Sequence, residues 1–407
     1  MNKKILLILI TTALLFCFAG VSYGRMPTSR LSRKRTELFK PLLPNTDLQR
    51  AIERLRQTRD DFEKKYGTYF SFLVNYQFQD ALASERNEGN ARNSWYYSID
   101  IEQRLWEGAS GEVEIEGDFG KGIDPLLPTF AGLNGAATAD SSLYIPRYFL
   151  TQKAWDERIR FSFGKIDLSD WFDQNEVASS NDTQFLSNAL ANNLIIPFPG
   201  KGLGCWANFK FLDWVYIRSG FSDAAAISNQ PGFRWPLRNP FFINELGLTP
   251  KIGSLQGNFR FIYWINFQKR EFLNGEGSYN NDNGFGVSFD QEVLENTSLF
   301  FRYGYAQQKV RSVDNFWSIG GQTRGLFTGR KYDVLGFAMT QSLTGDAFQK
   351  NSGYPTGSAE TLFETYYRFE FYKTLTVTPD LQVVIDPAAQ KKAKCDVVGG
   401  VRVALIF

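Results

Sequence analysis

The sequence predicts an all-β fold: a transmembrane antiparallel β-barrel of about 16 strands. Three observations lead to this prediction. Aromatic side chains make up 16% of the 407 residues, yet the mean hydropathy is only −0.29. The chain has one long apolar run, at its N-terminus, whereas several membrane helices would need repeated runs of about 20 residues. From residue 68 onward, segments of about ten residues alternate between apolar and polar side chains, which hides their hydrophobicity from averages.

Residues 1–24 have the pattern of a cleaved signal peptide. Two lysines precede an apolar run over 5–21, and Ser22 and Gly24 supply the small side chains that signal peptidase requires. An uncleaved membrane anchor is the alternative. Removal of the leader would leave 43 basic residues (45 minus two) against 43 acidic ones. A neutral mature chain is not expected to bind nucleic acid, which needs a basic excess.

Two further segments precede the strands. Residues 25–45 form a basic arm, with six Lys or Arg residues against one acidic residue. We expect a solvated periplasmic arm, with contact to anionic lipid headgroups as the alternative. Residues 46–66 predict a short amphipathic helix, because Thr46 and Gln49 form a capping box before apolar residues at helical spacing. This helix would pack below the barrel or make a small coiled-coil contact.

The alternating segments place aromatic side chains on one face and charges on the other. Phe259, Phe261 and Tyr263 share the apolar face of one segment, and Glu114 and Glu116 share the polar face of another. Aromatic rings suit a lipid-facing surface, and the ions would line a water-filled lumen. The expected strands are 68–79, 93–106, 110–119, 142–154, 157–166, 202–211, 213–222, 240–249, 256–268, 283–292, 297–307, 314–323, 332–343, 360–372, 374–385 and 395–407.

The chain contains no histidine, which removes the Ser-His-Asp triad and most zinc sites. Alternating carboxylates on one strand point the same way and cannot flank a glycosidic bond. We therefore expect no enzyme, no cofactor and no metal site. Cys205 and Cys395 lie far apart in sequence, and we expect them to stay buried as small apolar residues. A disulfide between them, formed in an oxidising periplasm, is the alternative.

Three segments resemble those of the carbohydrate-selective porin (OprB) family. A Gly-rich turn and strand at 325–342 reads GLFTGRKYDVLGFAMTQS, and a late hairpin at 364–387 reads ETYYRFEFYKTLTVTPDLQVVIDP. A strand that leads into a long loop at 158–175 reads RIRFSFGKIDLSDWFDQN. The terminal Phe407 resembles the signal by which barrel-assembly machinery recognises its substrates. The resemblance implies an outer-membrane barrel, spanning 67–407, in a Gram-negative-type bacterium.

The resemblance also implies that the loop at about 166–200 folds inward and narrows the barrel. Its carboxylates, amides and aromatic rings are suited to sugars, and arginine forks on the wall would face them. For any one ion, a structural pair within the wall is the alternative. The residues expected to line the solute pathway are Arg104, Glu114, Glu116, Arg147, Arg158, Arg160, Trp171, Asp173, Arg218, Glu364 and Arg368.

The function expected from these features is passive diffusion of carbohydrates through a constricted, water-filled barrel. An exporter of an acidic polysaccharide is the first alternative, although it would need a strongly basic lumen. A secreted β-sandwich that binds carbohydrate is the second. The expected partners are sugars or other small polar solutes, outer-membrane lipid and the assembly machinery, with a homotrimer as a candidate assembly.

Overall fold

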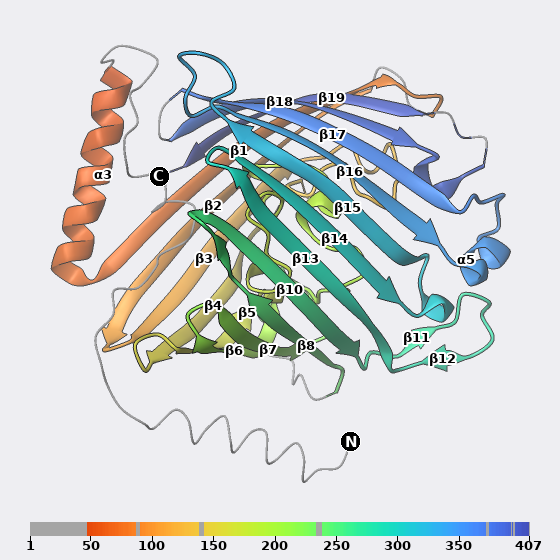
Figure 1. Ribbon diagram of the computed structural model, residues 1–407, viewed down its shortest axis with the longest axis horizontal. Coiled ribbons are helices and arrows are strands. Elements are labelled where there is room, and N and C mark those ends of the chain that lie inside the picture. Colours follow the sequence, from red (N-terminus) through yellow and green to blue (C-terminus); the bar gives the residue numbers. More distant parts are fainter. Residues whose placement is uncertain are drawn as a thin grey trace, which may run out of the picture.

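Sixteen antiparallel strands close into a barrel in the computed structural model (Figure 1). The structure describes all residues except 1–46, 87–89, 138–141, 233–237, 372–373, 392, 394 and 407. Strand β1 (Thr68–Ala83) pairs with β2 (Ala91–Trp106) on one side and with β19 (Asp396–Ile406) on the other, so the sheet has no free edge. The remaining wall strands are β3 (Ala109–Gly120), β4 (Ser142–Ala154), β5 (Ile159–Ile166), β6 (Gly202–Leu212), β7 (Val215–Asp223), β8 (Pro240–Leu248), β10 (Leu255–Asn266), β13 (Asp282–Leu294), β14 (Thr297–Ala306), β15 (Val313–Arg324), β16 (Val334–Thr344), β17 (Ala359–Glu370) and β18 (Leu375–Ile385).

The predicted barrel is confirmed, and each of its sixteen wall strands coincides with an expected one to within a few residues. Closure of the sheet rules out the β-sandwich alternative, which has open edges. The predicted signal peptide, the basic arm and Phe407 lie outside the described residues. Cys205, on β6, and Cys395, before β19, are both free thiols, as expected, but Cys205 is only half-buried and Cys395 is exposed.

The two ends of the barrel differ. At one end, here called the turn end, short connections such as 107–108 and 213–214 join the strands, and β1 begins there. The opposite loop end carries the long connections, among them 121–141 and 167–201. The loop end also holds the short elements β11 (Arg270–Glu271), β12 (Ser278–Tyr279), η2 (Gln308–Val310), α5 (Asp346–Asn351) and η3 (Pro387–Ala389), while β9 (Lys251–Ile252) lies in a connection at the turn end.

Helix α3 (Asp47–Tyr66) lies across the turn end, beside the start of β1 (Figure 1). The ring of Phe62 lies 5.5 Å from that of Phe70, and Glu63 pairs with Arg104 at 2.9 Å. The helix therefore packs at the end of the barrel, as expected, although Thr46 of its capping box lies outside the described residues. No helix within the described residues is both long and apolar enough to cross a membrane.

The outer face carries the aromatic rows that alternation predicts. Phe261 and Tyr263 are 44% and 50% exposed, whereas Ile262 and Trp264 between and beside them point inward and are buried. Exposed rings continue around the wall and include Trp95, Phe119, Phe163, Phe285 and Phe337. In a membrane barrel these side chains face lipid.

The inner face is only partly the charged, wet surface that the sequence suggested. Two segments, 121–137 and 167–201, fold into the barrel and bury apolar side chains there. Phe172, Phe185 and Leu190 of the second connection pack in one cluster with inward-facing strand residues such as Trp264 and Phe300. Each buried side chain of this size stabilises the packed loop by roughly 1.5–3 kcal/mol. The inward-folded loop is confirmed, but it rests on an apolar core that the sequence analysis did not foresee.

Candidate solute passage

The wall formed by β2 and β3 presents a ladder of carboxylates to the lumen. Strand alternation puts them on one face, and the register places Asp100 opposite Glu114 and Ser98 opposite Glu116. Glu114 and Glu116 are 6% and 5% exposed, so their charges need partners nearby. This ladder gives the lumen an acidic side.

Basic groups from β4 and from the inward loop meet that ladder. Arg147 Nε donates to Glu114 Oε2 at 2.6 Å, and Arg147 Nη2 lies 3.4 Å from Asp100 Oδ1. The same guanidinium donates to Asp170 of the loop. Lys201, at the end of the loop, donates to Glu116 at 2.5 Å. Charges of both signs thus bridge the wall and the loop.

Two of the loop's charged groups have shifted pKa values. Desolvation inside the barrel raises the pKa of the Asp170 carboxyl to about 7, although its side chain is 35% exposed and the attraction of Arg147 works in the opposite direction. Burial lowers the pKa of Lys201, but the carboxylates of Glu114 and Glu116 raise it by more, so the net shift is upward. Lys201 is therefore a fixed positive charge near neutral pH, whereas Asp170 titrates there.

Beside these ion pairs lies a cluster of aromatic rings with an arginine next to it. The Trp171 ring lies 4.8 Å from Trp206 and 5.5 Å from Phe149, edge-on to the latter. The Arg160 guanidinium carbon lies 5.8 Å from the Trp206 ring centre. Within the described part of the chain, Arg160 and Glu112 have neither an ion pair nor a side-chain hydrogen bond, unlike Arg147. Both are half-buried and remain free to bind a solute.

The opposite wall holds the inward loops in place. Glu364 accepts from the backbone N–H groups of Leu186 and Ser187, and Glu360 accepts from those of Phe130 and Ala131. Arginines of other strands donate to loop carbonyls: Arg218 to Trp171, Arg302 to Asp173 and Leu190, Arg368 to Thr183, and Arg402 to Asn181 and Gln184. These strand ions replace water as partners of the loop backbone.

Small residues on the strands let the loop lie close to the wall. A Cβ added at Gly304 would lie 2.5 Å from Asn193 Oδ1 and 2.9 Å from Ile195 Cβ. A Cβ added at Gly220 would lie 2.7 Å from the Phe172 ring. Glycine at these two inward-facing positions is a packing requirement of the loop.

The expected pathway residues therefore fall into three groups. Those on the acidic wall and its basic partners come together as expected: Glu114, Glu116, Arg147, Arg160 and Trp171. Those expected to line a wet lumen but found as supports of the loop are Asp173, Arg218 and Glu364, which are buried, and Arg368, which is half-buried. Those at the turn end are Arg104, 53% exposed beside Glu63, and Arg158, 48% exposed beside Asp213.

The wet-lumen expectation is wrong for the second group, for a physical reason. Asp173 and Glu364 are each 1% exposed. The loop that Glu364 holds also covers it, and Asp173 belongs to that loop and pairs with Arg302 of the wall. Arg158 lies in the turn before β5 and so does not share the inward face of Arg160. Lys201 and Arg302 were not among the residues expected from the sequence. Alternation along a strand does not distinguish an ion that lines the passage from an ion that supports the loop, because the difference depends on the path of the loop.

A closed barrel of sixteen strands, narrowed by a loop folded into its lumen, is the architecture of an outer-membrane porin. The Pseudomonas putida OprB structure at high pH superposes with a TM-score of 0.77 at 18% identity, covering 87% of this chain and 97% of that one. The Acinetobacter baumannii channel DcaP gives 0.52 at 11% identity, over 84% and 97%. Both likenesses concern the fold.

The chain belongs to the carbohydrate-selective porin, OprB family, whose sequence model matches residues 106–407. Among curated proteins, it is 24% identical to Porin AaxA of Chlamydia abortus over 275 residues. That match covers 67% of this chain and 58% of the relative's own length. The resemblance drawn from the three segments is thereby confirmed, and the chain is an outer-membrane protein.

Proposed function

We propose that this porin passes carbohydrates by passive diffusion between the β2–β5 wall and the inward loop. One observation carries the proposal: Arg160 and Glu112 are charged and half-buried, and no described residue satisfies them. A planar guanidinium can donate to two neighbouring sugar hydroxyls, and a carboxylate can accept from them. The half-buried ring of Trp171, which packs on the buried Trp206 beside Arg160, supplies a surface for the apolar face of a sugar ring.

The charge pattern of the passage suits weak and reversible binding. Most of its ions are already paired, as in Arg147 with Glu114, so few groups can hold a solute for long. Transport requires that a solute both enter and leave, which weak sites allow. The family and fold are those of a channel, and we propose that no catalytic step accompanies passage.

An exporter of an acidic polysaccharide fits this wall poorly. The carboxylates of β2 and β3, among them Asp100 and Glu116, would repel a polyanion along the whole passage. The proposed function requires no contact between copies of the chain, and the homotrimer stays a prediction.

The test is solute selectivity in a liposome-swelling assay with neutral, acidic and basic sugars. Arg160→Ala should raise the swelling rate for large solutes and reduce the preference among sugars. Arg158→Ala is the matched control, because Arg158 is two residues away but lies exposed at the turn end. If both variants keep the wild-type preference, Arg160 takes no part in selection. If the wild-type protein passes no sugar although it conducts ions, the carbohydrate assignment is wrong.

A further inference from the structure

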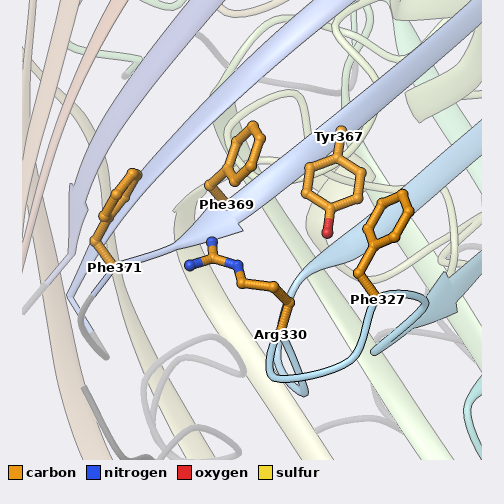
Figure 2. Close-up of a pocket in the computed structure, with 5 residues that line it drawn as sticks. All are labelled: Phe327, Arg330, Tyr367, Phe369 and Phe371. Carbon is orange, nitrogen blue, oxygen red and sulfur yellow. The ribbon is translucent and has the colours of Figure 1, made fainter. Parts of the chain in front are cut away.

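An aromatic groove opens on the outer face of the barrel, away from the solute passage. Phe327, Arg330, Tyr367, Phe369 and Phe371 line a cavity of about 430 Å³ (Figure 2). Phe327 and Arg330 come from the connection 325–333, and the other three from the end of β17 and the residue after it. Alternation along β17 points Tyr367 and Phe369 outward, because Tyr366 beside them is buried inside. The groove therefore faces the membrane.

The position of the groove in the membrane follows from the barrel ends. The connection 325–333 joins β15 and β16 at the turn end, where α3 also lies. In outer-membrane barrels the short connections face the periplasm. The groove thus lies at the depth of the periplasmic leaflet's headgroups, and 325–333 is the longest connection at that end.

A cation lies among these rings. The Arg330 guanidinium carbon is 5.4 Å from the Phe369 ring centre and 5.8 Å from that of Phe371 (Figure 2). Cation–π attraction holds the guanidinium beside the lipid-facing rings. On the other side of Arg330, Phe327 packs on Tyr367 with ring centres 5.6 Å apart. An arginine is thereby presented to the membrane from an apolar setting.

Hydrogen bonding orients this guanidinium and leaves part of it unsatisfied. Arg330 Nε donates to Asp333 Oδ2 at 2.6 Å, and the Tyr367 hydroxyl donates to the same oxygen at 2.9 Å. Asp333 Oδ1 accepts from the Glu370 backbone N–H, so both carboxylate oxygens are engaged. Within the described chain, Arg330 Nη2 is buried without any acceptor. A buried N–H group of this kind is costly unless an acceptor reaches it.

We propose that this groove binds a glycerophospholipid of the periplasmic leaflet. The phosphate would accept from the Nη groups of Arg330, and an acyl chain would lie along Phe327, Tyr367 and Phe369. A phosphate diester supplies the missing acceptor in a geometry that a guanidinium fork matches. Lys331, next in sequence, adds a second positive charge at the same depth and favours an anionic headgroup.

The test is native mass spectrometry of the delipidated protein titrated with phosphatidylglycerol. Arg330→Gln should weaken binding of the first lipid about tenfold, the effect of one charge-assisted hydrogen bond. Arg324→Gln is the matched control: Arg324 is also exposed at the turn end but does not line the groove. Equal lipid binding by the wild type and by Arg330→Gln would overturn the proposal.

Three further measurements distinguish a phospholipid from the other candidate occupants of the groove. Diacylglycerol, which lacks the phosphate, should bind the wild type and Arg330→Gln alike. Loss of the lipid adduct in excess inorganic phosphate would assign the site to free phosphate instead. A protein dimer that Arg330→Gln abolishes would assign the groove to a second copy of the chain. If Arg330→Gln fails to fold, Phe369→Leu, which keeps the groove apolar but removes a ring from the guanidinium, should weaken lipid binding, and unchanged binding would equally refute the proposal.

Discussion

Replacing Arg302 should loosen the constriction. This guanidinium is fully buried, pairs with Asp173 Oδ1 at 3.3 Å, and donates to the Leu190 and Asp173 carbonyls at 2.7 and 2.9 Å. Arg302→Met keeps the volume of the side chain but leaves the Asp173 carboxylate buried without its cation. Removing one partner of a buried ion pair costs about 3–5 kcal/mol of stability. Because Arg302 lies on β14 and Asp173 on the loop, that penalty falls on attachment of the loop.

A penalty of that size changes the ratio of detached to attached loop by a factor of roughly 10²–10³ or more. In planar bilayers, single-channel recordings of Arg302→Met should show excursions to higher conductance that are rare in the wild type. Arg260→Met is the control: Arg260 pairs with Asp290 at 2.7 Å and is just as buried, but both residues lie on wall strands. It should lower barrel stability without widening the channel.

A second variant tests the electrostatic cause. Arg302→Met with Asp173→Asn removes both charges, and asparagine tolerates the positive φ of 56° at this position. The amide oxygen can still accept from the Asn193 backbone N–H, which donates to Asp173 at 2.7 Å. The double variant should therefore conduct more like the wild type than Arg302→Met does. Wild-type recordings from Arg302→Met, or identical behaviour of Arg302→Met and Arg260→Met, would refute the reasoning.

Three other predictions concern the passage and its surroundings. Because burial raises the pKa of Asp170 to about 7, the passage should lose a negative charge as pH falls from 8 to 6; the potassium-to-chloride permeability ratio should fall in that window, and Asp170→Asn should flatten the response. The same raised pKa means that Asp170 binds a proton more strongly when the loop is attached than when it is detached. Attachment is therefore favoured as the pH falls from about 7 towards 3.8, the usual pKa of an aspartate, and this contribution is lost above pH 7. Gly304→Ala should raise single-channel conductance, because the new methyl group would overlap Asn193 and Ile195 and push the loop away from the wall. An unchanged conductance would show that the loop accommodates the methyl group without a change in the width of the passage. Arg104→Ala should lower the free energy of unfolding in a urea titration by less than about 1 kcal/mol, because its pair with Glu63 is half-exposed; a larger loss would mean that α3 supports the barrel more strongly than this pair suggests.

The barrel could be predicted from sequence because its rule is local. A period of two along each strand separates Phe261 and Tyr263 from Ile262 and Trp264, and no knowledge of distant contacts is needed to see it. The same rule identifies which residues point inward. It does not say what an inward residue meets there, since that depends on where the loop 167–201 runs.

The glycines carried a signal that could have located the loop. Gly220 and Gly304 interrupt strands on their inward faces, where a side chain would normally help to fill or line the barrel. Glycine inside a strand marks a close approach by another backbone or a ligand. Combined with inward Phe241 and Trp264, this pattern indicates a wall covered by something apolar. Inward glycines and aromatics could thus have distinguished the covered wall from the wet one, whereas the charges alone could not.

The inward ions do two different jobs, and hydrogen bonding separates them. Arg302 and Glu364 are buried and bound to loop carbonyls and N–H groups, so a solute does not reach them. Arg160 and Glu112 lack such partners within the described chain and keep their bonding capacity. A channel without an energy source can select only through groups that stay unsatisfied until a solute arrives, and only if the constriction holds its shape meanwhile. The buried ions that bind the loop fix the shape of the constriction, so substitutions among them should change channel width. Substitutions at Arg160 or Glu112 should instead change which solute is preferred.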